Sequence, residues 1–387
     1  YLLNLIDTPG HVDFSYEVAR SLQACEGALL VVDAAQGVEA QTVANVYLAV
    51  EANLEIIPVL NKIDLPSADI DGTMLQIEEE LGIDTTNVVK ASAKAGIGIE
   101  EILEAIVKHI PPPKDAQAEP LRALIFDSWF DAYLGAVSLV RVMTGEVKKG
   151  MRMKMMSTGN DFEVLKVAKL TPKLVEVSSL TCGMVGVVSG SIKTVRDTKV
   201  GDTITSASKP APTALAGFQD AKQMVFGGIF PVESSEYTNL KDSLEKLLMN
   251  DASLTMEPES SQALGFGYRV GFLGLLHMDI IQERLEREYN LDLIFTAPTV
   301  VYNVKTSSGD TLRIENPSKL PDANEIEVFE EPYVRIVVHT PEEYIGAILK
   351  ILQDKRGIQQ DIEYNNTKKI KIIYELPMNE MIFDFHD

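Results

Sequence analysis

Residues 28–64 read ALLVVDAAQGVEAQTVANVYLAVEANLEIIPVLNKID. Two apolar runs in this stretch, Ala28–Asp33 and Glu55–Asn61, have the length of strands, and the segment Glu39–Ala52 between them has the spacing of a helix. Strands that are apolar along their whole length and are joined through a helix are typical of a parallel sheet covered on both faces. The stretch therefore predicts an α/β unit with right-handed crossovers.

The same alternation of strand and helix continues on both sides of this stretch. It predicts further strands at Tyr1–Asp7 and Val88–Ser92, and further helices near Phe14–Cys25, Thr73–Leu81 and Glu100–Ile110. In such sheets ligands bind at the carboxyl ends of the strands. We therefore look for functional side chains directly after each predicted strand.

Polar motifs follow three of these strands. They are Asp7-Thr8-Pro9-Gly10-His11, Asn61-Lys62-Ile63-Asp64 and Ser92-Ala93-Lys94. Because the carboxyl ends of parallel strands meet at one edge of a sheet, the motifs are expected to lie together. In this order and at these distances they make up most of a guanine-nucleotide site.

Asp64 is the residue expected to select the base. Guanine presents adjacent N–H donors on one edge that a carboxylate can accept, and adenine would leave this carboxylate unpaired, which discriminates by roughly 10⁴-fold. Lys62 can lay its alkyl stem over the purine, while Asn61 braces the loop and Ile63 completes the motif. Taken alone, these four residues could also be a solvated polar turn.

The third motif complements the second. Ala93 can offer its backbone amide to the guanine carbonyl oxygen, Ser92 shapes the turn, and Lys94 covers the other face of the base. Because the two motifs occur together, a guanine-nucleotide site explains them better than a solvated polar turn does.

The first motif predicts the phosphate side of the site. Asp7 can hold Mg²⁺ through water, as the acidic strand residue does in P-loop enzymes. Gly10 lets the backbone approach a γ-phosphate without a Cβ, and loss of that contact on hydrolysis would release the following segment. His11 is placed to orient the attacking water. The alternative for His11 is a surface loop imidazole.

A phosphate-binding loop is not found in the sequence. No G-x-x-x-x-G-K followed by Ser or Thr occurs among the 387 residues. We therefore expect residues 1–112 to be an incomplete P-loop-type GTP-binding domain of α/β class that lacks its P-loop and switch I portion. On its own the 387-residue chain is expected to bind GTP weakly and to hydrolyse almost none.

The remaining sequence predicts three further domains after the linker at Pro111-Pro112-Pro113. Short β-rich runs broken by glycine turns predict an antiparallel β-barrel over 118–208. Two βαββ patterns predict α+β sandwiches of the ferredoxin-like kind over 213–297 and 331–387, joined by a connector over 298–330.

The second sandwich shows local helix and turn signals, and it is expected to be truncated. Thr340 and Glu343 have the spacing of a capping box, and Gly357 is placed to end the same helix. Asn365-Asn366 predicts the turn between the two strands that follow.

The composition restricts the partners. The formal net charge of -22 disfavours extended nucleic-acid contact, although residues 113–208 carry more basic than acidic residues and could contact RNA locally. The 2 cysteines, Cys25 and Cys182, lack metal-binding spacing and fit reduced thiols. No apolar run reaches the roughly 18 residues of a membrane span.

The motifs resemble those of a known family. Residues 7–14, DTPGHVDF, with Asn61–Asp64 are similar to the translational GTPases, the group that contains elongation factors Tu and G. Residues 271–279, GFLGLLHMD, residues 126–134, FDSWFDAYL, and the short distance between the two sandwiches resemble the LepA, or elongation factor 4, family.

The resemblance implies a monomeric, cytoplasmic, ribosome-dependent GTPase that uses GTP and Mg²⁺. It implies contacts with ribosomal RNA, with ribosomal proteins near the factor-binding site and with tRNA, and a task in tRNA back-translocation or ribosome maturation. It also implies peripheral association with the cytoplasmic face of the plasma membrane. Two alternatives stay open: a translocase like elongation factor G, and a non-catalytic ribosome-binding scaffold.

Overall fold

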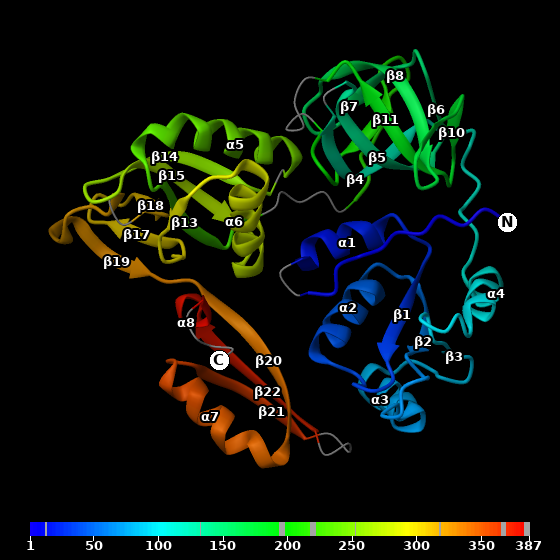
Figure 1. Cartoon of the computed structure of the whole chain (residues 1–387), viewed down its shortest axis with the longest axis horizontal. Helices are drawn as coiled ribbons and strands as arrows, with labels where there is room; N and C mark the ends of the chain where they lie inside the picture. The colour runs from blue at the N-terminus through cyan, green and yellow to red at the C-terminus, as the bar shows by residue number, and fades with distance from the viewer. Residues whose placement is uncertain are drawn as a thin grey trace. The chain divides into compact units, whose positions relative to one another are not determined.

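The computed structural model describes residues 1–11, 14–131, 133–192, 198–216, 222–251, 253–316, 319–364 and 369–382. They form two compact units, the first made mainly of residues 1–221 and the second mainly of residues 222–387. Figure 1 labels most of the helices and strands of both.

A three-stranded sheet of order β1-β2-β3 begins the first unit. β1 (Gly27–Asp33) and β2 (Glu55–Asn61) are parallel and pair along their whole length, so that Asp33 lies opposite Asn61. The short β3 (Val89–Lys90) is parallel to β2. The helices of this part are α1 (Ser15–Gln23), α2 (Ala40–Glu51), α3 (Ile70–Leu81) and α4 (Ile99–His109). The parallel pairing predicted for the two central strands is confirmed.

Apolar side chains from strands and helices hold this sheet in place. Val32 of β1 and Leu60 of β2 pack in one core with Val43 of α2 and Ile77 of α3. Burying a side chain of this size contributes about 1.5–3 kcal/mol. The core thus fixes the position of both strand ends.

The strand predicted at Tyr1–Asp7 is wrong. Residues 1–10 belong to no helix or strand of the structure, and the side chain of Asp7 is exposed. Tyr1, Leu2 and Leu5 are exposed as well. Apolar composition does not make a strand by itself, because a strand needs a neighbour that pairs its amides and carbonyls. Among the described strands, β1, β2 and β3 pair only with one another.

Six antiparallel strands later in the first unit form a closed sheet (Figure 1). The ring is made of β4 (Arg122–Asp131), β5 (Gly135–Thr144), β7 (Arg152–Met155), β8 (Asp161–Leu170), β11 (Val185–Gly190) and β12 (Thr203–Ser206). β11 closes it, because it pairs with β5 on one side and with β8 on the other. All six strands contribute apolar side chains to one core, including Met153, Val188 and Ile204.

Three short strands accompany the ring. β9 (Leu174–Glu176) pairs with β8, and β6 (Glu146–Lys148) pairs with β10 (Ser179–Thr181) in a separate two-stranded sheet.

A four-stranded antiparallel sheet of order β14-β15-β13-β16 begins the second unit. Its elements are β13 (Val225–Pro231), α5 (Tyr237–Asn250), β14 (Thr255–Ser261), β15 (Gly265–Phe272), α6 (Leu275–Tyr289) and β16 (Leu293–Phe295). Leu244 of α5 and Ile281 of α6 share one core with Val270 of β15. Both helices therefore cover the same face of the sheet (Figure 1).

Two smaller sheets complete the second unit, in the orders β18-β17-β19 and β20-β22-β21. Their elements are β17 (Tyr302–Thr306), β18 (Thr311–Ile314), β19 (Ile326–Glu330), β20 (Tyr333–Pro341), α7 (Ile345–Asp354), β21 (Ile358–Tyr364), β22 (Lys369–Pro377) and α8 (Met378–Ile382). The turn predicted at Asn365-Asn366 lies outside the described residues.

The start predicted for α7 is wrong. Thr340 is still part of β20, where it lies opposite Ile370, and its hydroxyl donates to the carbonyl of Pro341. A short 3-10 turn, η6 (Glu342–Tyr344), then precedes the helix. Pairing with β22 keeps Thr340 extended, so it does not cap the helix.

The predicted end of α7 also differs. Arg356, not Gly357, adopts the left-handed backbone conformation, with φ 59°. This costs a residue with a Cβ roughly 1–2 kcal/mol, and the Arg356 guanidinium is bound by Glu331 at 2.8 Å and by Glu380 at 2.9 Å. Gly357 is required for space instead, because a Cβ there would lie 2.6 Å from the carbonyl oxygen of Leu352.

We predict opposite effects for two glycine substitutions around this helix. Gly357→Ala should destabilise the sheet β20-β22-β21 by about 1–3 kcal/mol because the added methyl overlaps backbone. Gly346→Ala, within α7 and with open space around its Cβ position, should stabilise it by up to about 1 kcal/mol. Amide hydrogen exchange of β22 measures both changes, and equal effects of the two variants would contradict this account.

Candidate functional site

The ends of the parallel strands carry the polar residues of the site. Asp33 ends β1 and Asn61 ends β2, and the register places the two residues opposite one another. Ser92 follows shortly after β3. Three loops therefore leave the sheet at neighbouring points, and they contain the second and third motifs.

Asn61 joins two of these loops. Its side-chain Oδ1 accepts a hydrogen bond of 3.1 Å from the backbone amide of Ala93, and its carbonyl accepts one of 2.9 Å from the amide of Ala34. These two hydrogen bonds are the contacts through which Asn61 would brace the loop, as predicted. The Ala93 amide is the donor predicted for a base oxygen, so binding a base through it requires that Asn61 share or release this hydrogen bond.

Lys62 reaches back to the end of the neighbouring strand. Its Nζ lies 2.6 Å from Asp33 Oδ2, and its backbone is left-handed with φ 62°. Asp33 Oδ1 also accepts a hydrogen bond of 2.8 Å from the amide of Ala35. The hydrogen bond from Lys62, helped by that from the Ala35 amide, holds the pKa of Asp33 below its usual value. The carboxylate is therefore charged at neutral pH.

Ile63 and Asp64 complete the second motif. The amide of Ile63 donates to the carbonyl of Ala91 at 3.3 Å, and the Ile63 side chain packs against the core of the sheet. Asp64 is exposed. Ile63 thus anchors the loop, and Asp64 is on its accessible side.

A closed turn presents the third motif. The amides and carbonyls of Ser92 and Ile97 exchange two hydrogen bonds of 3.0 Å each, and the Oγ of buried Ser92 accepts a bond of 3.1 Å from the amide of Ala95. Ala93 and Lys94 are exposed on this turn. The predicted role of Ser92 in shaping the turn fits these contacts.

The first motif contacts a different element. The carbonyl of exposed Gly10 accepts a hydrogen bond of 3.2 Å from Asn45 of α2. His11 is half-buried, with its ring centroid 6.4 Å from that of Phe14. Asp7 is an exposed hard oxygen ligand, which fits Mg²⁺, because this ion keeps several waters and usually takes one or two carboxylates together with substrate phosphate.

The structure thus brings together Asp33 with residues 61–64 and 92–94, and it joins Gly10 to α2. Asp33 is the member of this cluster that the sequence analysis did not single out. Its signal was present, because it is an acidic residue at the carboxyl end of a predicted strand, in the same position as Asn61 on the next strand.

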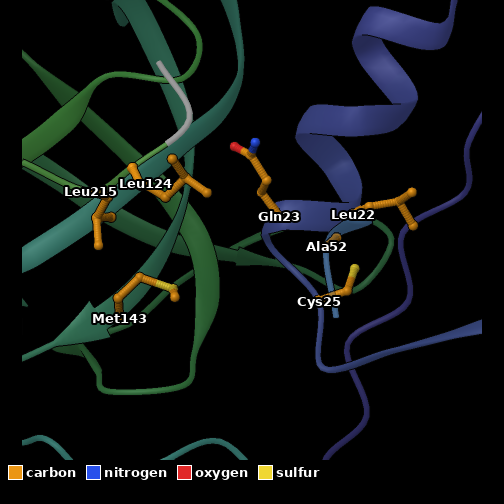
Figure 2. A pocket seen from close by; sticks show the side chains of 8 residues that line it. Leu22, Gln23, Cys25, Ala52, Leu124, Met143 and Leu215 are labelled. Carbon is orange, nitrogen blue, oxygen red and sulfur yellow. The ribbon is translucent and has the colours of Figure 1, made fainter. Parts of the chain in front are cut away.

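A separate pocket of about 220 Å³ lies at the end of α1, against the closed sheet (Figure 2). Its labelled lining includes Leu22 and Cys25 on one side and Leu124 and Met143 on the other. Burial raises the pKa of the Cys25 thiol, and nearby Arg141 partly offsets this effect. The pocket contains none of the residues of the three motifs.

The chain matches family models of translation factors. They are described as Elongation factor Tu GTP binding domain over residues 1–112, Elongation factor Tu domain 2 over residues 135–205 and Elongation factor G C-terminus over residues 328–387. Over these residues the chain is therefore similar to GTP-binding translation factors.

Curated relatives narrow the class. Proteins named Elongation factor 4 from Picosynechococcus, Sorangium cellulosum and Desulfitobacterium hafniense are 57%, 58% and 58% identical over 100% of this chain. Over its whole length the chain therefore resembles the elongation factor 4, or LepA, family. It spans 64% of the length of these relatives. The high sequence identity to proteins named Elongation factor 4 does not favour the alternative of a translocase like elongation factor G.

A more distant solved structure agrees on the fold alone. It is the crystal structure of a protein from Thermus thermophilus, with 18% identity and a TM-score of 0.64, and the match covers 97% of this chain and 83% of that one.

None of the helices in the described parts of the chain is long and apolar enough to cross a membrane.

We predict that Asn61→Ala separates the two base-side loops. The Ala93 amide loses its acceptor, so the loop containing residues 92–94 should lose about 1 kcal/mol of local stability and exchange its amide hydrogens faster. Asn61→Asp keeps the oxygen at this position and is the matched control. Exchange at Ala93 that is unchanged in Asn61→Ala would show that this bond does not hold the loops together.

Proposed function

We propose that this chain is the core of a ribosome-dependent GTPase that binds GTP and GDP with Mg²⁺ and hydrolyses GTP. The observation that carries the proposal is the hydrogen bond between Asn61 and the Ala93 amide. It brings the Asn-Lys-Ile-Asp and Ser-Ala-Lys motifs together at the carboxyl ends of parallel strands, where α/β sheets bind nucleotides.

The proposed base recognition uses accessible groups of these loops. Asp64 accepts the N–H donors of guanine, Lys62 and Lys94 cover its two faces, and the Ala93 amide approaches the base oxygen. Ile63 and Ser92 hold the two loops in place. Adenine lacks the donor pair, so the site would bind it with Asp64 unsatisfied.

The proposed phosphate side uses the first motif. Gly10 admits the γ-phosphate close to the backbone, and His11 orients the attacking water. Asp7 would hold Mg²⁺ through water, and this ion supplies neutralisation of the phosphate charge during phosphoryl transfer. Because phosphoryl transfer needs little covalent chemistry from the protein, positioning of the water is the main task of His11.

For the intact protein we propose action on the ribosome, on tRNA position in back-translocation or on ribosome maturation, with contacts to ribosomal RNA, to ribosomal proteins and to tRNA. The acidic net charge of -22 supports local rather than extended RNA contact. We propose a cytoplasmic monomer. Membrane association has no support in the comparisons and is not part of the proposal.

For the domain organisation we propose boundaries at 1–112, 118–208, 213–297 and 331–387, with 298–330 as connector. The barrel assignment is supported by closure through β11. The ferredoxin-like assignment is supported by the order β14-β15-β13-β16 with two helices on one face.

We predict that Asp64→Asn changes the base specificity. Asn offers an NH₂ donor as well as an oxygen acceptor, so it should pair with xanthine, which has a carbonyl oxygen where guanine has an amino group. The guanine nucleotide affinity should fall by at least about 100-fold, as for loss of a charged hydrogen-bond partner. Calorimetric titration of the intact protein with GDP and XDP measures the change. An equal loss for both nucleotides would remove Asp64 from base recognition.

We predict that His11→Ala separates hydrolysis from binding. The ribosome-stimulated kcat of the intact protein should fall by about 10²- to 10⁴-fold, because the attacking water loses its orienting group. The Kd for GDP should change little, since His11 is assigned to the water and not to the base. The control is His109→Ala, at the end of α4. A kcat that survives in His11→Ala would assign the water to another residue.

A further inference from the structure

A stacking residue as exposed as Lys62 would be mobile if nothing held its ammonium group. Its side chain is 53% exposed, and a lysine side chain has a flexible stem of four carbons. Immobilising such a side chain on binding costs affinity. A site that uses the stem of Lys62 as a wall for the base therefore benefits from a group that holds the ammonium in advance.

Asp33 is placed to hold it. The ammonium of Lys62 lies 2.6 Å from Asp33 Oδ2, and the Asp33 side chain is only 17% exposed. The other oxygen, Oδ1, accepts the Ala35 amide at 2.8 Å, so the carboxylate is fixed on its own backbone. The stem of Lys62 thus runs from the loop after β2 to the end of β1, next to Asn61 on the sheet.

The backbone of Lys62 is held in an energetically unfavourable conformation. A left-handed φ of 62° disfavours a residue with a Cβ by roughly 1–2 kcal/mol. The turn is kept by the Leu65 amide, which donates to the Lys62 carbonyl at 3.1 Å, and by the Ile63 amide, which donates to Ala91 at 3.3 Å. Backbone strain of this kind is concentrated at functional sites.

We propose that Asp33 is a positioning residue of the guanine site, which anchors the Lys62 ammonium so that the lysine stem is in place before the base binds. The inference rests on the proposed function. A stabilising role for the pair is small, because ion pairs with one exposed partner contribute little to stability. The hydrogen bond from Lys62 keeps the pKa of Asp33 low, which keeps this anchor charged at neutral pH.

Asp33→Asn tests the anchor with little other change. The side-chain oxygen of Asn can still accept the Ala35 amide, but its NH₂ then faces the ammonium and cannot bind it. The Kd of the intact protein for GDP, measured by calorimetry, should rise about two- to tenfold, the cost of immobilising one long side chain. Asp33→Ser, whose hydroxyl can also accept the Ala35 amide, provides the same test if the Asn variant does not fold.

A double-mutant cycle with Lys62→Met separates positioning from a structural effect. Methionine keeps an unbranched stem and has no charge, so Asp33→Asn should have no further effect on the Kd in this background. The control is Asp84→Asn. Asp84 is an exposed carboxylate of the same sheet unit, bound to the amide of Thr86 at 2.8 Å, and its loss should leave the Kd unchanged.

The outcomes are distinct. Additive effects of Asp33→Asn and Lys62→Met, or an equal effect of Asp84→Asn, would overturn the positioning role while guanine binding persists. If the unsubstituted protein binds ADP as well as GDP, the proposed function itself fails.

Discussion

The parallel pairing of β1 with β2 is the constraint on which the site depends. It sets Asp33 and Asn61 opposite one another, and two side-chain contacts that connect the loops start from these positions. Asn61 reaches forward to Ala93 on the third loop, and Asp33 reaches to Lys62 on the second. A slip of one strand by one residue would turn its own end residue, Asp33 or Asn61, to the other face of the sheet and remove the bond that this residue makes.

The strand ends also explain how a few residues could form the proposed base-binding site. The apolar core below them, with Val32, Leu60 and Ile77, fixes the backbone, and the loops above are held by hydrogen bonds between backbone groups and by the Asn61 side chain. Asp64 and Lys94 are exposed on these loops. Binding residues are often found on loops that a rigid scaffold positions, and the proposed site follows this rule.

The sequence alone was sufficient for those elements whose signal is local. Ala28–Asp33 and Glu55–Asn61 were predicted to within one residue because both have an apolar interior and polar ends. Prediction from the sequence failed where the determinant lies elsewhere in the chain. Tyr1–Asp7 has the composition of a strand but pairs with none of the described strands. Thr340 has the sequence of a helix cap but is held extended by β22.

The same distinction between local and distant determinants applies to the site residues. The motif residues were found from their types and spacing, whereas the Asp33–Lys62 pair joins two segments separated by a helix, and its geometry requires the register. The left-handed conformation of Arg356 is another feature that the local sequence does not predict. Glycine is the usual left-handed residue after a helix, but here the neighbouring Gly357 is needed for close packing, and two carboxylates hold Arg356 in the strained conformation.

The place of β12 in the ring has a consequence for biosynthesis. β12 is the last strand of the ring along the chain and pairs with the earlier strands β4 and β7, so the cylinder cannot be completed before Ser206 has left the ribosome that is making it. Until then the edges of β4 and β7 remain open, and open edges invite pairing with other chains. The nascent chain thus passes through a period in which it is vulnerable to aggregation, and the arrival of one four-residue strand ends that period.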